Sequence, residues 1–250
     1  MSTPAFDDRA DCYDALIDWP KRLANEEPFY RGLFERNGVR RVLDAACGTG
    51  RHAAMFRSWG CAVEAADLSP AMIAQCQRQF GESPTLRWVV RPFDQTVEPA
   101  ESFDAAICVG NSLALAADIA TAERAVRQML SAVRPGGVCV LQVLNLWHLP
   151  DGPTVWQKCK RVPLDGVDHV LVKGVHRAGN RGFVDLVDLT LMPDGVVPRY
   201  DCPTFLGLEA ADVVRMAGQA GAREVRCYGG YRGAAYERDR STDLIVVAER

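Results

Sequence analysis

Residues 41–50 constrain the fold of this chain more than any other segment. Their sequence, Arg-Val-Leu-Asp-Ala-Ala-Cys-Gly-Thr-Gly, places Val42 and Leu43 before a carboxylate and a glycine-bearing turn, and a helical pattern begins near His52. Glycines in such a turn let the backbone come close to a ligand, and a helix start offers unpaired N–H groups. The segment therefore predicts a strand, a tight turn and a helix in immediate succession.

A second acidic residue adds to this pattern. Asp67 ends the sequence Val-Glu-Ala-Ala-Asp, which predicts a second strand. An acid at the end of that strand can accept hydrogen bonds from both hydroxyl groups of a ribose. The turn and Asp67 together predict a cofactor site of the nucleotide type.

The spacing within the turn distinguishes between classes of cofactor. Dinucleotide sites arrange their glycines as Gly-x-Gly-x-x-Gly, so that a pyrophosphate rests on the helix N-terminus. This chain has Asp44 followed by Gly48 and Gly50 instead. A carboxylate at the mouth of the turn repels a pyrophosphate and attracts an ammonium group. The spacing therefore disfavours an NAD-linked oxidoreductase and favours a ligand with a positive charge.

Strands and helices alternate along most of the chain. The pattern predicts strands at 41–45, 62–66, 86–90, 103–109, 138–144, 224–228 and 244–248, and helices at 52–59, 70–80, 119–133 and 208–220. Such alternation produces a parallel sheet with helices on both faces. The predicted fold class is α/β, with a doubly wound, mostly parallel, seven-stranded, Rossmann-like sheet.

The alternation stops at Trp147, after the fifth strand. Predicted strands at 170–176, 183–191 and 196–205 are separated by turns, including an Asp-Gly turn at residue 194. We expect an antiparallel β insertion of three or four strands, with one face buried against the main sheet.

The expected organisation has three parts. Residues 1–38 form an N-terminal helical segment, which Pro20 and Pro28 are expected to break into pieces. Residues 39–146 and 207–250 form the cofactor-binding core, and residues 147–206 form the antiparallel β insertion, or lid.

Composition narrows the classes of partner. With 250 residues and a net charge of −3, the chain has room for one large domain with an insertion and lacks the basic surface expected of a nucleic-acid or anionic-membrane binder. The nine cysteines show no CxxC spacing, so we expect free thiols, a reducing compartment and no metal site. Without a signal-peptide pattern or membrane-length apolar run, a cytoplasmic location is expected. A homo-oligomer is left open.

The glycine-bearing motif and Asp67 resemble those of the class I S-adenosylmethionine-dependent methyltransferases. Ala46 stands where many members have the first glycine, and this Asp-x-Ala-Cys-Gly-Thr-Gly form is similar to the glycine and sarcosine N-methyltransferase branch. The resemblance covers roughly residues 10–145 and 208–250. It implies S-adenosylmethionine as cofactor, S-adenosylhomocysteine as product, and a final antiparallel hairpin at the sheet edge.

Several further residues are expected to hold this cofactor. Asp94 and Phe93 follow the third strand and Val109 ends the fourth, so these residues are candidates for contacts with the adenine. The resemblance assigns the cofactor's carboxylate to Arg22; a solvent-facing arginine and an exposed loop aspartate are the alternatives for Arg22 and Asp94. The expected cofactor residues are Arg22, Asp44, Ala46, Gly48, Gly50, Asp67, Leu68, Phe93, Asp94 and Val109.

The residues expected to bind the methyl acceptor differ from those of the glycine and sarcosine N-methyltransferase branch. The sequence Gly-Asn-Ser at residues 110–112 is similar to the branch, but the histidine that follows there is replaced by Leu115. After the fifth strand, Val143 and Leu144 stand where the branch has His-Arg, whose arginine holds a substrate carboxylate. Tyr13 and Asn111 are expected to align the substrate with the methyl group, and a core or dimer contact is the alternative for Tyr13.

The predicted reaction is in-line methyl transfer to a small molecule, with amines among the acceptors. Such a reaction depends mainly on alignment and on exclusion of water. An oxygen or carbon acceptor would also need a base, for which the candidates are His169, His176, Tyr200, Tyr228 and Tyr231. We expect the loop 229–236 to form a pocket wall. The alternative is a cofactor-binding regulatory or non-catalytic module of the same fold.

Overall fold

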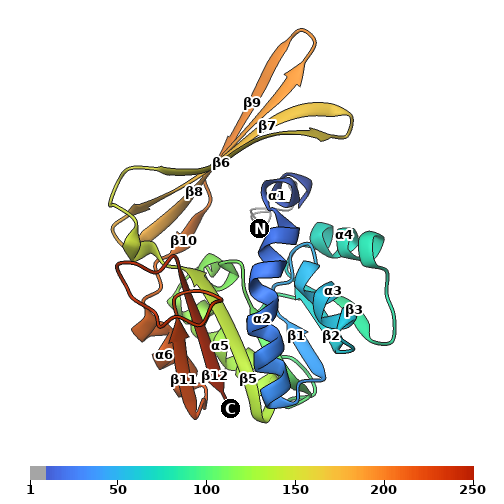
Figure 1. Cartoon of the computed structure of the whole chain (residues 1–250), viewed down its shortest axis with the longest axis vertical. Helices are drawn as coiled ribbons and strands as arrows, with labels where there is room; N and C mark the ends of the chain where they lie inside the picture. The colour runs from blue at the N-terminus through green and yellow to red at the C-terminus, as the bar shows by residue number, and fades with distance from the viewer. Residues whose placement is uncertain (1–9) are drawn as a thin grey trace.

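The chain folds into two β-sheets. The computed structural model describes residues 10–250, apart from the side chains of Ala10, Asp11 and Tyr13. The larger sheet has helices on both faces, and the smaller sheet extends away from one end of it (Figure 1).

The larger sheet has seven strands in the order β11-β12-β5-β4-β1-β2-β3. Its strands are β1 (Arg41–Asp44), β2 (Ala62–Asp67), β3 (Leu86–Val90), β4 (Phe103–Cys108), β5 (Val133–Leu144), β11 (Glu224–Tyr228) and β12 (Asp243–Glu249). Neighbours among β1 to β5 are parallel, whereas β12 is antiparallel to both β5 and β11. The predicted fold class is confirmed, including the antiparallel hairpin at the edge.

Residues 10–250 contain six α-helices and two short 3-10 helices. They are α1 (Ala10–Leu16), α2 (Trp19–Asn37), α3 (Arg51–Ser58), α4 (Pro70–Phe80), η2 (Ser112–Leu115), α5 (Ile119–Ala132), η3 (Leu146–His148) and α6 (Ala210–Gln219). Helix α4 begins as predicted, because the Ser69 hydroxyl accepts a hydrogen bond from the Met72 N–H at 3.1 Å. None of the helices in residues 10–250 has the length and apolar character needed to cross a membrane.

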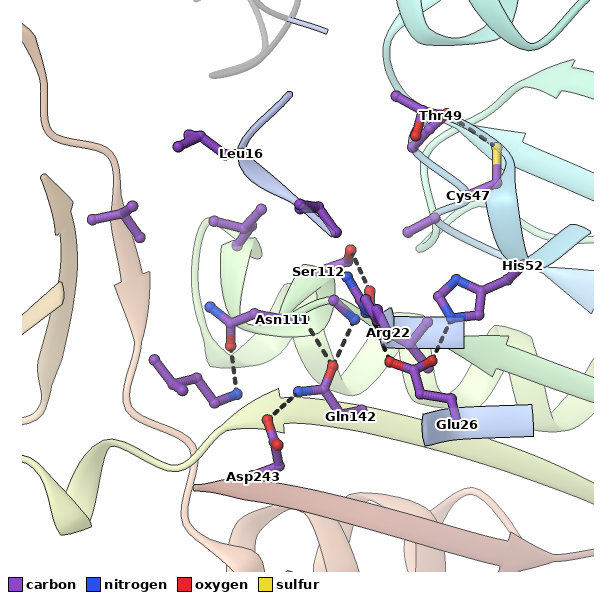
Figure 2. Close-up of a pocket in the computed structure, with 18 of the residues that line it drawn as sticks. Leu16, Arg22, Glu26, Cys47, Thr49, His52, Asn111, Ser112, Gln142 and Asp243 are labelled. Carbon is purple, nitrogen blue, oxygen red and sulfur yellow. Dashed lines mark hydrogen bonds and ion pairs between the residues drawn. The ribbon is translucent and has the colours of Figure 1, made fainter. Parts of the chain in front are cut away.

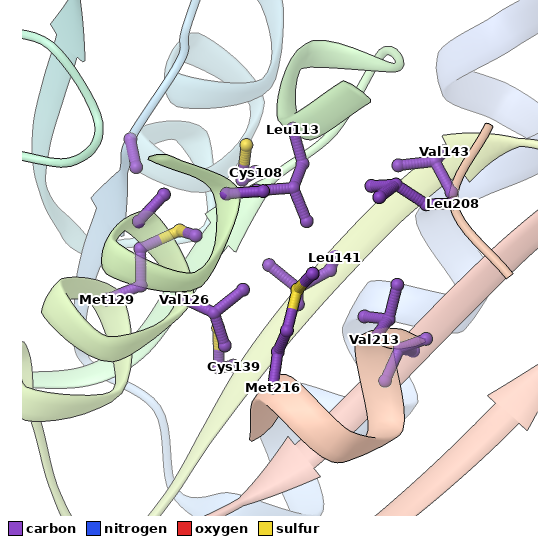
Figure 3. Close-up of a cluster of buried hydrophobic side chains, with 14 of the residues drawn as sticks. Cys108, Leu113, Val126, Met129, Cys139, Leu141, Val143, Leu208, Val213 and Met216 are labelled. Carbon is purple, nitrogen blue, oxygen red and sulfur yellow. The ribbon is translucent and has the colours of Figure 1, made fainter. Parts of the chain in front are cut away.

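Each face of the larger sheet has its own hydrophobic core. Leu43 of β1 belongs to the core under α5 and α6, part of which Figure 3 shows, whereas Val42 beside it belongs to the core under α2, α3 and α4. Adjacent strand residues point to opposite faces, so both faces must be covered by apolar helices. Cys108 and Cys139 are fully buried in the first of these cores, and all nine cysteines are free thiols.

The prediction that Pro28 breaks the N-terminal segment is wrong. Helix α2 runs through Pro28 from Trp19 to Asn37, while Pro20 lies in its first turn, where a missing N–H does no harm. Pro28 and Ala24 are both exposed, so water can hydrate the Ala24 carbonyl that loses its partner. Burial of residues further along, such as Tyr30 and Phe34, holds the helix in place.

The smaller sheet has five strands instead of the three or four expected. They are β6 (Val155–Leu164), β7 (Val167–Ala178), β8 (Arg181–Met192), β9 (Gly195–Asp201) and β10 (Thr204–Leu206), paired antiparallel. Strand β6 was missed because it is an exposed edge strand that contains basic residues and Pro163. The strand expected over 196–205 is interrupted at Pro203, which cannot donate a ladder hydrogen bond.

The face of the smaller sheet packs largely on helix α1, and the expectation that it packs on the main sheet holds only at one end. Leu171 and Leu186 form a separate small core with Leu16 of α1. Val175 and Phe205, by contrast, belong to the main core. The long strands extend past the main sheet, and there Leu171 and Leu186 pack on Leu16 of the N-terminal helix α1.

We predict that Gly50 is required for packing. A Cβ at Gly50 would lie 2.6 Å from the Trp88 ring, and its φ is +76°. Gly50→Ala should lower the free energy of unfolding by about 2–5 kcal/mol, from left-handed strain of ~1–2 kcal/mol and overpacking of ~1–3 kcal/mol. Gly48→Ala is the control, since its φ is +53° and nothing lies within 4 Å of its Cβ. Urea denaturation measures both losses, and equal values would contradict the packing role.

Candidate active site

A large cavity lies at the carboxyl ends of the parallel strands. Strand β1 pairs with β2 on one side and β4 on the other, so the strand order reverses there, and open α/β sheets bind ligands at such a point. The cavity has a volume of about 2060 Å³, against about 300–1,000 Å³ for typical small-molecule sites. It therefore has room for a cofactor together with an acceptor.

The turn after β1 and the end of β2 are joined by the Asp67 carboxylate. One of its oxygens accepts a hydrogen bond from the Gly48 N–H at 2.8 Å, and the other accepts from the Ser69 N–H at 2.9 Å. Asp67 and Gly48 both line the cavity. Two of the residues expected from the sequence thus lie together, and the carboxylate is held by the backbone on either side.

Asp44 is buried without a hydrogen-bond partner among the described residues. Its exposed fraction is 1%, and neither carboxylate oxygen makes a hydrogen bond of ordinary geometry. Burial and the negative charge of Asp67 raise the pKa of Asp44 to about 8, which the Ala46 backbone N–H offsets only in part. Asp44 does not line the cavity itself, but Ala45 and Ala46 beside it do. An unpartnered buried carboxylate here is suited to a cationic ligand.

Arg22 is held by a buried pair that sequence reasoning missed. Its Nε donates to Glu26 at 2.8 Å, and the other Glu26 oxygen accepts from Nε2 of His52 at 2.6 Å (Figure 2). Burial alone would raise the pKa of Glu26, but its hydrogen bonds with His52 and Arg22 and the charge of Arg22 lower the pKa overall. Burial lowers the pKa of His52, which favours a neutral ring that donates from Nε2. An ionised Glu26 therefore orients the Arg22 guanidinium.

Only part of this arrangement was visible in the sequence. Arg22 and Glu26 are four residues apart on one helix, the spacing at which opposite charges meet. His52 carries no comparable signal, because it lies on α3 and meets Glu26 only through packing of the two helices.

The residues expected to contact the adenine, Phe93, Asp94 and Val109, also line the cavity. So does Leu68, another of the expected cofactor residues. Leu68 is 55% exposed and Val109 is buried. Asp94 forms an ion pair with Arg124 at 3.1 Å. Gly50 is not among the lining residues.

On the acceptor side, a chain of hydrogen bonds connects Asn111 with Asp243. The Gln142 side-chain oxygen accepts from the backbone N–H groups of Gly110 at 2.6 Å and Asn111 at 3.3 Å, and its Nε2 donates to Asp243 at 2.7 Å (Figure 2). The Asn111 side chain accepts from the Leu144 N–H at 2.9 Å. Burial raises the pKa of Asp243. No sequence motif identified Gln142 or Asp243 as site residues, because strand pairing brings them to Asn111.

Three of the five candidate bases are not part of the cavity lining. His169 bonds Asp188, whereas His176 and Tyr200 both bond Asp185, at 2.6–2.8 Å. These side chains therefore serve contacts within the smaller sheet.

Tyr228 and Tyr231 do line the cavity, as do other residues of the loop expected to form its wall. Tyr13 lies on α1, but its side chain is outside the described residues. In the part of the chain that the structure describes, no group of His, Cys, Asp or Glu side chains could hold a metal ion.

We predict that Asp44 makes stability depend on pH. Its pKa is about 8 in the folded protein and about 3.9 when unfolded, so the folded state binds the extra proton. The contribution of Asp44 to stability is therefore fully present below about pH 4 and should fall by up to about 1.4 kcal/mol per pH unit as the pH rises toward 8. Asp44→Asn should flatten this slope in urea denaturation measured across that range. Parallel profiles for the two proteins would contradict the assignment.

Comparison with known proteins places this geometry in a family. Residues 42–137 match the family model described as a methyltransferase domain. Glycine N-methyltransferase from Rattus norvegicus is 30% identical over 160 residues, covering 56% of this chain and 55% of the relative. Glycine/sarcosine N-methyltransferase from Parasynechococcus marenigrum is 30% identical over 159 residues, covering 59% and 53%. The chain spans about half the length of the curated relatives it matches.

Solved structures agree over almost the whole chain. The sugar N-methyltransferase KedS8 from a Streptoalloteichus species has a TM-score of 0.72 at 27% identity and covers 91% of this chain, which covers 87% of it. The CcbJ methyltransferase from Streptomyces caelestis has a TM-score of 0.79 at 20% identity, with 99% and 98% covered, and shows the same fold. The methyltransferase domain, the N-methyltransferase relatives and the structural neighbours together support a class I S-adenosylmethionine-dependent methyltransferase.

Proposed function

We propose that this protein transfers a methyl group from S-adenosylmethionine to an amine nitrogen of a small molecule. The observation that carries the proposal is Asp44, a buried carboxylate without a hydrogen-bond partner among the described residues, next to a cavity that Asp67 lines. The named activities of the relatives, on glycine, sarcosine and sugars, support an amine acceptor.

The polar residues around the cavity fit the two ends of this cofactor. Asp44 would pair with its ammonium group and Arg22, oriented by Glu26, with its carboxylate, whereas Asp67 would accept from the ribose hydroxyls. When bound, S-adenosylmethionine supplies an electrophilic methyl group on a sulfonium.

The remaining expected residues would enclose the adenine and the backbone of the cofactor. Leu68, Phe93 and Val109 offer apolar surface, and Asp94 can accept from the adenine amino group. Ala46 and Gly48 would allow close approach of the turn, and we assign Gly50 to its packing.

On the acceptor side, the chain would orient the amine and exclude water. Asn111 is fixed by Leu144 and Gln142, and we propose it and Tyr13 as the residues that align the acceptor. An amine must lose a proton before its lone pair can attack. Asp243 faces the cavity, and its raised pKa suits it to take that proton.

We further propose that residues 147–206 cover the acceptor and select it, while 39–146 and 207–250 form the cofactor core and 1–38 the helical segment before it. The smaller sheet contributes to the cavity wall from β6, β7 and β8. Nine free cysteines support a reducing, cytoplasmic location. The proposal requires no nucleic acid or membrane partner, and a homo-oligomer is compatible with it.

The proposal is tested with methyl-labelled S-adenosylmethionine and a panel of amines that includes glycine, sarcosine and amino sugars. We expect S-adenosylhomocysteine to bind in calorimetry and label to appear in at least one amine. Binding without transfer to any amine or phenol would favour a non-catalytic module. Absence of binding would contradict the cofactor assignment itself.

Two variants separate the ends of the cofactor site. Arg22→Gln should weaken the binding of S-adenosylhomocysteine by about 1.5–3 kcal/mol, the value for a hydrogen bond to a charged group. It should leave the affinity for 5′-methylthioadenosine unchanged, because that compound has the ribose and adenine but no carboxylate. Asp67→Asn should weaken the binding of both ligands. Calorimetry measures the four affinities, and equal losses of both ligands in Arg22→Gln would contradict its role.

A further inference from the structure

Lysine is rare in this chain and is concentrated at the cavity. Of the four lysines, Lys158, Lys160 and Lys173 lie on the adjacent strands β6 and β7, and Lys21 lies on α2. Lys158 and Lys173 line the cavity and are directly opposite each other in the register of the two strands. Like charges in that position destabilise a sheet.

Two of these lysines have structural partners. Nζ of Lys158 donates to the Leu16 carbonyl at 2.8 Å, and Nζ of Lys160 donates to the Ala15 carbonyl at 3.1 Å. Both bonds satisfy carbonyls at the end of helix α1, where cations are favourable. Their role is therefore to fix α1 against the smaller sheet.

Lys173 lies among apolar residues on the cavity side of β7. Leu171 and Val175, two residues before and after it on the same face, are 2% and 1% exposed. No hydrogen bond or ion pair to its ammonium group exists among the described residues. Burial and the positive charges of Lys158 and Arg22 lower the pKa of Lys173 to about 8.

The acidic side chains near Lys173 already have other partners. Of the two aspartates in β8, which pairs with β7, Asp188 bonds His169 at 2.8 Å and Asp185 bonds His176 at 2.8 Å and Tyr200 at 2.6 Å. Across the cavity lining, Arg22 is paired with Glu26. The smaller sheet thus presents to the cavity a half-buried cation without a counter-charge of its own.

We propose that Lys173, supported by the charge of Lys158, binds a carboxylate or similar anionic group on the methyl acceptor. A ligand anion would relieve the repulsion between the two lysines and replace the water that Lys173 loses on burial. No cation at the end of β5 competes for this role, because Val143 and Leu144 are apolar. The inference rests on the proposed function and names its acceptor class: a small amine that also carries an anionic group.

The cofactor also has a carboxylate. The first experiment therefore distinguishes binding of an acceptor anion at Lys173 from binding of the cofactor's own carboxylate. Acetylation of the four lysines by acetic anhydride is followed residue by residue by mass spectrometry, without ligand, with S-adenosylhomocysteine, and with S-adenosylhomocysteine plus sodium sulfate at constant ionic strength. We expect sulfate to slow acetylation of Lys173 at least fivefold and to leave unchanged the control, Lys160, which is not among the cavity-lining residues. Protection by S-adenosylhomocysteine alone would assign Lys173 to the cofactor, and absence of protection in every state would overturn the site.

The second experiment uses variants and paired acceptors. We expect the wild type to prefer carboxylate-bearing amines over the corresponding amides by at least tenfold in kcat/KM. Lys173→Met should abolish this preference and Lys173→Arg should retain it, while the affinity for S-adenosylhomocysteine stays unchanged in both. A preference that persists in Lys173→Met, or is absent in the wild type, would refute the inference. Failure of the proposed function is seen separately, as loss of S-adenosylhomocysteine binding or of all transfer in the wild type.

Discussion

The two hydrogen bonds to the Asp67 carboxylate are the interaction on which the site depends. They come from the backbone N–H groups of Gly48 and Ser69, so they fix the turn after β1 against the end of β2. Burial and the negative charge of the same carboxylate raise the pKa of Asp44, a buried acid with no hydrogen-bond partner among the described residues. Binding of a cation next to Asp44 would stabilise the fold, because its charge would offset the free-energy cost of burying this carboxyl group.

Charges around the cavity are distributed by element. Acidic groups stand at the ends of β1 and β2, the Arg22 cation is presented by α2 with its own counter-ion Glu26, and Lys173 comes from β7 of the smaller sheet. This arrangement matches the proposed cofactor, which has an ammonium and a carboxylate at one end. It also leaves a cation for the acceptor on the part of the chain proposed to select it.

Prediction from sequence succeeded where local spacing is sufficient. The alternation of strands and helices and the cap at Ser69 follow from patterns within a few residues, and the structure confirms them. It failed where a local rule is overridden by context: Pro28 lies inside a helix held by buried residues, and β6 is a basic edge strand whose partner β7 stabilises it. Neither feature has a signal in its own segment.

The amino-acid sequence was sufficient to predict the fold class and the place of the cofactor motif, because periodicity and glycine spacing are local properties of the chain. It could not predict which charges have partners, since these pairs form only in the folded structure. Glu26 reaches His52 by helix packing, Gln142 joins Asn111 to Asp243 across paired strands, and Lys173 has no counter-ion among the described residues. Whether a buried charge is neutralised depends on groups that are distant in sequence, and their meeting is a property of the packed chain alone.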